Sequence, residues 1–316
     1  MKIVILDGFL ANFDDIGLSI GQHRQVWYDT TLPGQVIERI GGAEGIVVNR
    51  VLITEEIIAA CPNLCYIGTT STGVNMIDLE AAKKRNITIC NVPEYSTNAV
   101  AQHTIALLLE VVGRVGEFNR LVHEDRWTRE DSREVVSIKT YELAGKTLGI
   151  YGAGNIGRKV AKIASVFDMN ILAFDKIQTK DPSYAFIDYV DLDTLLCRSD
   201  VLTIHAPLND ETRGFFSTQT IDKMKDGAIL INAARGAILD EKAVADALDN
   251  GKLTALGADV LSSEPPAKDN PIYNHPKAVI TPHVAWTPRE TRERLLRIVS
   301  ENILAFIAGK PQNAVS

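Results

Sequence analysis

Short apolar runs alternate with helical patterns along the whole chain. In the first third, the runs that predict buried strands are residues 3–6, 25–28, 45–48, 65–68 and 88–90. A second series predicts strands at residues 147–151, 170–174, 201–204, 228–231, 255–258 and 279–280. Helical patterns lie between the strands. This alternation is typical of parallel sheets covered by helices on both faces, so we expect an α/β protein with two doubly wound sheets.

Three further segments complete the predicted organisation. Residues 98–112 are apolar nearly all round, which predicts a buried helix. The last helix is expected at residues 289–308, because Gly309 and Pro311 follow it as stop signals. Residues 120–141 are charged and have no periodicity, which indicates an excursion from the core.

The composition is that of an ordinary globular protein. A chain of 316 residues is long for one hydrophobic core, so two domains are expected. A net charge of -7 argues against a nucleic-acid binder, which needs a basic face. The cysteines form no CxxC pair, so we expect neither a disulfide framework nor a metal site.

No segment has the pattern of a membrane anchor. The N-terminal apolar run is cut off by Asp7 and is typical of a strand, not a signal peptide. Residues 100–112 contain Gln102, His103 and Glu110, and they fall short of the ~20 residues that a membrane span needs. We therefore expect no membrane association and a cytoplasmic location.

The sharpest motif is G-x-G-x-x-G at residues 152–157, which lies between a predicted strand and a predicted helix. In dinucleotide-binding proteins the first glycine makes a tight turn, the second lets the backbone approach the pyrophosphate, and the third lets helix and strand pack closely. The helix N-terminus then offers free N–H groups to the phosphates. The motif predicts a dinucleotide cofactor.

An acidic residue follows at the end of the next predicted strand. Asp175 comes after Gly157 at close to the spacing of about 20 residues that places a carboxylate on the ribose 2′-OH. A carboxylate there would repel a 2′-phosphate, so NAD is expected rather than NADP. The neighbouring Lys176 weakens that preference.

Three polar residues each follow a predicted strand of the second series: Arg235, Glu264 and His283. Ligands of such sheets bind at the carboxyl ends of the strands. Reduction of a 2-keto acid needs a proton donor for the carbonyl oxygen, and a histidine suits that role. A carboxylate would hold the imidazole, and an arginine would polarise the carbonyl and pair with the substrate carboxylate. Each residue alone could be an ordinary surface or loop residue. Their joint placement after the dinucleotide motif favours a dehydrogenase.

Together these motifs resemble the D-isomer-specific 2-hydroxy acid dehydrogenase family over essentially the whole chain. The matching segments are GAGNIG with Asp175, HAPLNDETRG at 205–214, NAARG at 232–236, Glu264, and TPHVAW at 281–286. The resemblance implies that Arg235 binds and polarises the substrate, Glu264 supports the histidine, and His283 donates the proton.

The resemblance also implies a domain organisation. A flavodoxin-like substrate domain would consist of residues 1–98 and 287–316, and a Rossmann NAD-binding domain would be inserted as residues 99–286. Residues 120–141 match a segment that contributes to the dimer contact of the family, so a homodimer is expected.

The remaining site residues follow from the resemblance. The residues expected to bind the cofactor are Gly152, Gly154, Asn155, Ile156, Gly157, Asp175, His205, Ala206, Pro207, Thr212, Ala233, Ala234, Arg235, Asp259, His283 and Thr104. The residues expected to bind the substrate are Ser71, Thr72, Gly73, Arg235, His283 and Trp286. In the loop after the fourth strand, the backbone N–H groups of Thr72 and Gly73 would form a small nest for the substrate carboxylate.

Within the family the chain is most similar to the glycerate dehydrogenases, also called hydroxypyruvate reductases. The segments that point to this subgroup are YSTNAVAQHT at 95–104, SEPP at 263–266, and Trp286. The expected substrate is thus hydroxypyruvate or glyoxylate, reduced to D-glycerate or glycolate. Two alternatives stay open: a dehydrogenase of another D-2-hydroxy acid, lactate-like or branched, and a non-catalytic NAD(H)-sensing protein.

Overall fold

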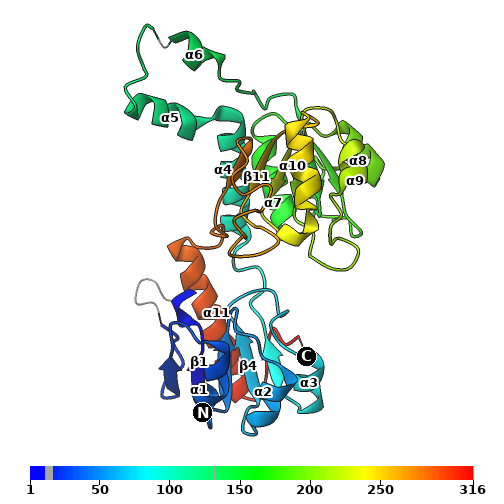
Figure 1. Ribbon diagram of the computed structural model, residues 1–316. Helices are drawn as coiled ribbons and strands as arrows, with labels where there is room; N and C mark the ends of the chain where they lie inside the picture. The colour runs from blue at the N-terminus through cyan, green and yellow to red at the C-terminus, as the bar shows by residue number, and fades with distance from the viewer. Residues whose placement is uncertain (11–16, 131, 316) are drawn as a thin grey trace. The chain divides into compact units, whose positions relative to one another are not determined.

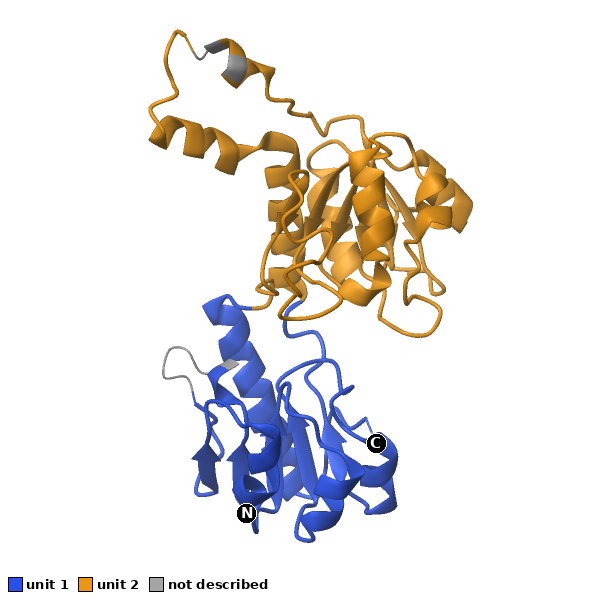
Figure 2. Ribbon diagram, in the orientation of Figure 1, with its two compact units in different colours: residues 1–96, 287–316 blue, residues 97–286 orange. Residues whose placement is uncertain are grey.

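The computed structural model describes residues 1–10, 17–130 and 132–315. The chain forms two compact units (Figure 2). Unit 1 consists of Met1–Ser96 and Thr287–Ser316, and unit 2 consists of Thr97–Trp286. Unit 2 is therefore an insertion in the sequence of unit 1, and the first boundary lies slightly before the one expected from the sequence.

Unit 1 is built on a parallel sheet in the order β2-β1-β3-β4-β5. Its strands are β1 (Lys2–Ile5), β2 (Arg24–Trp27), β3 (Gly45–Val48), β4 (Tyr66–Thr69) and β5 (Thr88–Cys90). This is the flavodoxin-like order, in which the direction of winding reverses between β1 and β3 and ligands bind at the carboxyl ends of the strands.

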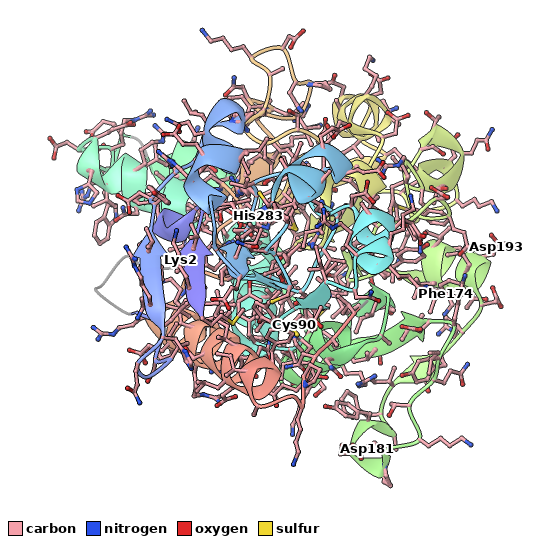
Figure 3. All side chains as sticks on the ribbon, turned by 90° about the horizontal axis from the view of Figure 1, so that it is seen from below. Lys2, Cys90, Phe174, Asp181, Asp193 and His283 are labelled. Atoms are coloured by element: carbon pink, nitrogen blue, oxygen red, sulfur yellow. The ribbon has the colours of Figure 1, made fainter. Side chains whose placement is uncertain are left out.

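Helices cover both faces of this sheet (Figure 1). They are α1 (Val36–Ile40), α2 (Glu55–Ala60), α3 (Leu79–Lys84) and α11 (Arg289–Ile307), with short 3-10 turns η1 (Gly8–Leu10) and η2 (Pro33–Gln35). One face packs against α1, α2 and α3 in a single apolar core. The other face packs against α11, where the Phe306 ring lies 5.0 Å from that of Tyr66. Cys90 at the end of β5 is fully buried (Figure 3).

Unit 2 contains a larger parallel sheet in the order β12-β11-β10-β9-β6-β7-β8. Its strands are β6 (Thr147–Tyr151), β7 (Asn170–Phe174), β8 (Asp188–Tyr189), β9 (Val201–Ile204), β10 (Ala228–Asn232), β11 (Leu253–Ala258) and β12 (Ala278–Ile280). The order reverses between β6 and β9, as in the Rossmann fold, and dinucleotides bind at this point of such sheets.

Two apolar cores lie on opposite faces of the unit 2 sheet. The helices and turns are α4 (Thr97–Gly113), α5 (Val115–His123), α6 (Ser132–Ser137), α7 (Asn155–Ser165), α8 (Leu192–Arg198), α9 (Thr218–Asp222), α10 (Glu241–Asp249), η3 (Pro182–Tyr184) and η4 (Gly236–Ile238). Helices α4 and α7 close one core, and α8, α9 and α10 close the other. Helices α5 and α6 project from the body of unit 2 (Figure 1).

The apolar character of α4 reflects this burial. Its buried side chains include Leu107, Leu108, Val111 and Val112, which belong to the core shared with α7. Among the described residues, no single helix is long and apolar enough to cross a membrane. Helices α4 and α5 together reach that length and composition, but the chain bends by 60° between them.

Candidate active site

The glycine-rich turn of unit 2 is a cradle that larger residues would fill. Gly152 has φ of 97°, and a Cβ there would lie 2.5 Å from the backbone nitrogen of Ala206. A Cβ on Gly157 would lie 2.2 Å from the carbonyl oxygen of Gly152. The turn therefore brings the ends of β6 and β9 and the start of α7 into close backbone contact, as a pyrophosphate site requires.

Helix α7 begins directly after this turn. Its N-cap is Gly154, which supplies no side-chain cap, and the N–H groups in the first turn of a helix have no acceptor within the helix, so this end favours an anion. Arg158, which the sequence motif did not single out, donates to the Ala153 carbonyl oxygen at 2.8 Å and to the Asn155 side chain at 2.6 Å. The positive charge of Arg158 and a helix N-terminus thus lie at one turn, and these residues fit the pyrophosphate of a dinucleotide.

Asp175 lies beside the cradle, immediately after β7. One of its carboxylate oxygens accepts from the Ile177 N–H at 2.9 Å, and the N–H of Gly152 donates to the carbonyl oxygen of Phe174 at 2.9 Å. The carboxylate expected to bind the ribose is therefore anchored next to the glycine-rich turn. Its neighbour Lys176 is paired with Glu211.

The loop after β9 supplies the other wall of the cradle. Ala206 abuts Gly152, and a ring nitrogen of His205 lies 3.0 Å from the Thr203 hydroxyl. Burial lowers the pKa of His205 to about 3. The imidazole is therefore neutral near physiological pH and adds no positive charge to the cofactor site.

Two threonines expected at the cofactor use their hydroxyls within their own segments. Thr212 donates to the carbonyl oxygen of Pro207 at 2.7 Å and accepts from the N–H of Asn209 at 2.9 Å. Thr104 is buried in α4 and donates to the carbonyl oxygen of Val100 at 2.8 Å. In the structure, the Thr212 hydroxyl stabilises the loop after β9, and the Thr104 hydroxyl stabilises α4.

Arg235 is presented by a turn that follows β10. The buried Asn232 closes this turn, since its side chain accepts from the Ala234 N–H and donates to the Arg235 carbonyl oxygen, both at 3.0 Å. The turn also carries Ala233, which is half-buried, whereas Arg235 is exposed. The Arg235 guanidinium donates to the carbonyl oxygen of Ala234 at 2.8 Å, and further donors of its fork remain for a ligand.

His283 and Glu264 form a close pair. Nδ1 of His283 lies 2.6 Å from Oε2 of Glu264, and the other oxygen of Glu264 accepts from the Leu261 N–H at 3.3 Å. A carboxylate on Nδ1 fixes the ring and directs Nε2 outward. This is the geometry of a positioned proton donor.

The backbone of His283 is held in an unusual conformation. Its φ of 55° is rare for a residue other than glycine. The N–H of His283 donates to the Asp259 carbonyl oxygen at 2.8 Å, and the Asp259 carboxylate accepts from the N–H groups of Val284 and Ala285 at 2.9 and 2.8 Å. Asp259 therefore fixes the turn that carries the histidine.

The Asp259 carboxylate is 1% exposed and has two further donors. The Thr281 hydroxyl donates to it at 2.6 Å, and Nε2 of His103 lies 3.3 Å away. Burial opposes its ionisation, but these hydrogen bonds outweigh burial and hold the pKa of Asp259 below its usual value. Asp259, expected to bind the cofactor, thus supports the His283 turn. His103, which the sequence analysis did not single out, contacts the same carboxylate. Trp286, the last residue of unit 2, is half-buried.

The loop after β4 in unit 1 is held by hydrogen bonds within the loop and to the segment after β5. The hydroxyls of Ser71 and Thr72 donate to the carbonyl oxygens of Gly73 and Val92 at 2.7 and 2.9 Å, and Asn91 donates to the Thr72 carbonyl oxygen at 2.8 Å. Within residues 1–10, 17–130 and 132–315, no acceptor engages the N–H of Thr72 or Gly73. The loop is therefore fixed without using these two donors, as far as the described residues go.

The buried carboxylate of Asp7 supports the loop after β4 through Asn49. Asp7 accepts from the N–H groups of Asn49, Arg50 and Val51 at 2.8, 2.5 and 3.1 Å. The Asn49 side chain then donates to the carbonyl oxygen and hydroxyl of Thr70. Burial raises the pKa of Asp7 despite these hydrogen bonds. The sequence showed Asp7 only as the end of a strand.

Residues 105–285 match the family described as D-isomer specific 2-hydroxyacid dehydrogenase, NAD binding domain. The chain belongs to the D-isomer-specific 2-hydroxyacid dehydrogenase family. It is an NAD-dependent oxidoreductase of 2-hydroxy acids, and its two parallel-sheet units are the fold of that family.

Relatives within this dehydrogenase family span the whole chain. The chain is 40% identical to the hydroxypyruvate reductase of Blautia hydrogenotrophica over 321 residues, which cover 100% of both chains. It is 35% identical to the glycerate dehydrogenase of Methylorubrum extorquens, over 93% of this chain and 92% of the relative. A solved acyclic imino acid reductase in complex with NADPH and D-Arg aligns with a TM-score of 0.84 and 30% identity, over 100% of each chain.

Proposed function

We propose that the protein reduces hydroxypyruvate or glyoxylate to D-glycerate or glycolate with NADH. The substrate class is supported by the full-length similarity to a hydroxypyruvate reductase and to a glycerate dehydrogenase. The single observation that carries the mechanism is the 2.6 Å contact between His283 and Glu264, because it presents an oriented proton donor at the ligand edge of the sheet.

Each polar group then has a distinct role. NADH, when bound, supplies the hydride that reduces C2 of the keto acid. Arg235 polarises the carbonyl and stabilises the negative charge that develops on its oxygen. His283 delivers a proton to that oxygen from Nε2, and Glu264 stabilises the protonated imidazole through Nδ1.

Binding of the two ligands is assigned to different units. Unit 2 holds NAD on the cradle at residues 152–157, with Asp175 accepting from the adenosine ribose. Unit 1 binds the substrate carboxylate through the free N–H groups of Thr72 and Gly73, and Trp286 contacts the substrate beside His283. Two observations support this assignment. In unit 1 the N–H groups of Thr72 and Gly73 have no acceptor among the described residues. In unit 2 the glycine-rich turn has no room for larger side chains.

The protein is further proposed to be a cytoplasmic homodimer. Helices α5 and α6 and the segment between them expose large apolar side chains, with Trp127 81% and Val136 80% exposed. Such side chains on a projecting segment favour burial against a second copy. The cysteines are unpaired thiols, which suits a reducing compartment.

The test of the function is the rate of NADH oxidation with hydroxypyruvate, glyoxylate, pyruvate, 2-ketoisocaproate and phosphohydroxypyruvate. A kcat/KM that is highest for hydroxypyruvate or glyoxylate supports the proposal. A lead for pyruvate or for the branched acid would keep the reaction and change the substrate. No turnover with any of them, despite NADH binding, would favour the NAD(H)-sensing alternative.

A further inference from the structure

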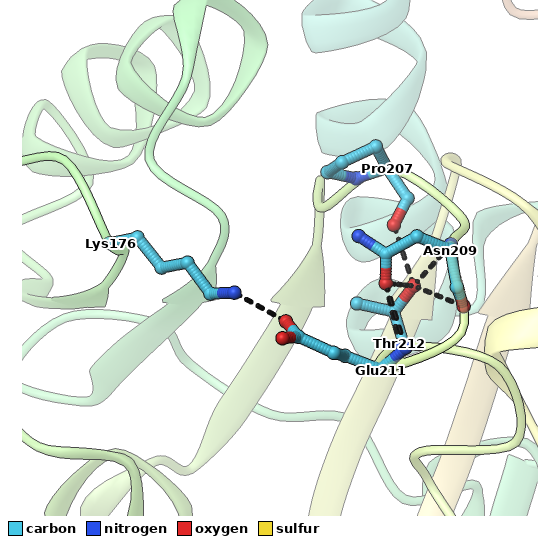
Figure 4. Close-up of polar contacts among 5 residues, drawn as sticks. All are labelled: Lys176, Pro207, Asn209, Glu211 and Thr212. Atoms are coloured by element: carbon cyan, nitrogen blue, oxygen red, sulfur yellow. Dashed lines mark hydrogen bonds and ion pairs between the residues drawn. The ribbon is translucent and has the colours of Figure 1, made fainter.

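An ion pair crosses the end of the strand that leads into the cradle. Lys176 follows β7, Glu211 lies in the loop after β9, and the two side chains are paired (Figure 4). In the sheet, β6 lies between β7 and β9. The pair therefore joins the two loops across the carboxyl end of β6, at the position where the glycine-rich turn begins.

Stability does not account for this pair. The side chains of Lys176 and Glu211 are 75% and 68% exposed, and exposed ion pairs contribute little to the free energy of folding. Its position beside the residue expected to bind the ribose suggests a role toward the ligand.

The loop that carries Glu211 is fixed internally. The side-chain oxygen of Asn209 accepts from the N–H groups of Glu211 and Thr212, both at 3.0 Å. The Thr212 hydroxyl donates to the carbonyl oxygen of Pro207 at 2.7 Å (Figure 4). The backbone at Glu211 is therefore held in place, and its carboxylate is aimed at Lys176 by a formed turn.

The negative charge of Glu211 also acts on Tyr151, at the end of β6. Tyr151 ends that strand and stacks between Phe174 and Phe215, with ring centroids 5.8 and 4.9 Å away. Burial raises the pKa of Tyr151, and the negative charge of Glu211 raises it further. The carboxylate thus acts electrostatically on the edge of the sheet where the adenosine is expected.

We infer that Glu211 selects NADH over NADPH by neutralising Lys176. An unpaired ammonium next to Asp175 would attract the 2′-phosphate of NADPH and offset the repulsion from the Asp175 carboxylate. The pair of Lys176 and Glu211 has no net charge, so Lys176 does not offset the repulsion between Asp175 and a 2′-phosphate. The inference rests on the proposed ribose contact of Asp175 and adds a second selecting residue to it.

The test is the equilibrium Kd of NADH and of NADPH, measured by fluorescence titration of the full-length protein without substrate. In Glu211→Gln we expect the Kd of NADPH to fall by about fivefold at low salt, with the Kd of NADH changed by less than about twofold. The gain should disappear in the double variant Glu211→Gln with Lys176→Met, because the gain comes from the freed ammonium. Salt should also reduce it.

Asp226→Asn is the matched control. Asp226 pairs with Lys252 at 2.7 Å and lies just before the amino end of β10, whereas Glu211 follows the carboxyl end of β9. The control variant has the same change in net charge and the same loss of an ion-pair partner. Its ratio of the two Kd values should equal that of the unchanged protein.

Two results would overturn the inference: an unchanged Kd ratio in Glu211→Gln, or a gain that survives Lys176→Met. An equal gain in Asp226→Asn would show that only net charge matters, which also contradicts it. The variant Asp175→Ala separates this inference from the ribose contact itself, because loss of discrimination there supports Asp175 whatever Glu211 does.

Discussion

Nδ1 of His283 lies 2.6 Å from Oε2 of Glu264, although the two residues sit on different loops after β11 and β12. Asp259 fixes the backbone of the histidine turn, so the imidazole has both its position and its orientation defined. In the proposed mechanism, this pair presents a proton donor that is oriented before substrate binds.

Glu264→Gln should lower kcat by about tenfold to a hundredfold, because the amide keeps the size of the side chain but loses the charge that stabilises a protonated imidazole. The Kd of NADH should not change. Steady-state rates with hydroxypyruvate and a fluorescence titration of NADH check both statements. An unaltered kcat would remove Glu264 from the proton-donating pair.

Arg235→Lys should lower kcat/KM for the keto acid by about a hundredfold even though the charge is kept, because lysine cannot reproduce the planar fork of donors. Arg198→Lys, on the exposed C-terminal turn of α8, is the control and should behave like the unchanged protein. Equal kcat/KM values for the two variants would contradict the polarising role.

Asp259→Asn should destabilise the protein by about 1–3 kcal/mol, because a buried carboxylate with several N–H and O–H donors is replaced by an amide that accepts through one oxygen. Chemical unfolding checks this value. Asp226→Asn, which removes a 91% exposed carboxylate from its pair with Lys252, should change the unfolding midpoint little. A midpoint of Asp259→Asn equal to that of the control would show that the carboxylate does not hold the His283 turn.

His205 predicts a pH dependence of stability with a definite sign. Burial lowers its folded-state pKa from 6.5 to about 3, so only the unfolded chain binds this proton between those values. The free energy of unfolding should therefore decrease as pH falls below about 6.5. His205→Gln should show a smaller loss of Tm between pH of about 7.5 and 5 than the unchanged protein. The control His123→Gln, at an exposed histidine, should lose as much Tm as the unchanged protein. An equally large loss in His205→Gln would contradict the low pKa of His205.

The strands were predictable from the sequence because most are buried apolar runs. The exception was β8, whose two residues, Asp188 and Tyr189, carry no such pattern. Helix α5 (Val115–His123) was not predicted, and its end overlaps the region from residue 120 that looked aperiodic, because the helix buries only Leu121. The end of α11 was predictable because Gly309 follows it as a local stop signal.

Arg235, Glu264 and His283, the residues proposed to react, were singled out because each follows a predicted strand. The residues that hold them in position could not be predicted from the sequence. The contact of His103 with Asp259 joins residues far apart in the chain, and the chain from Asp7 through Asn49 to Thr70 depends on the order of the strands. The Lys176–Glu211 pair likewise exists only because β6 separates β7 from β9.

The most direct test of the account compares the unchanged protein with His283→Ala at saturating NADH, with hydroxypyruvate as substrate. The account predicts turnover by the unchanged protein and a kcat lower by about 10²–10⁴-fold in the variant, with the same Kd for NADH. A variant that keeps most of its rate would contradict His283 as the proton donor.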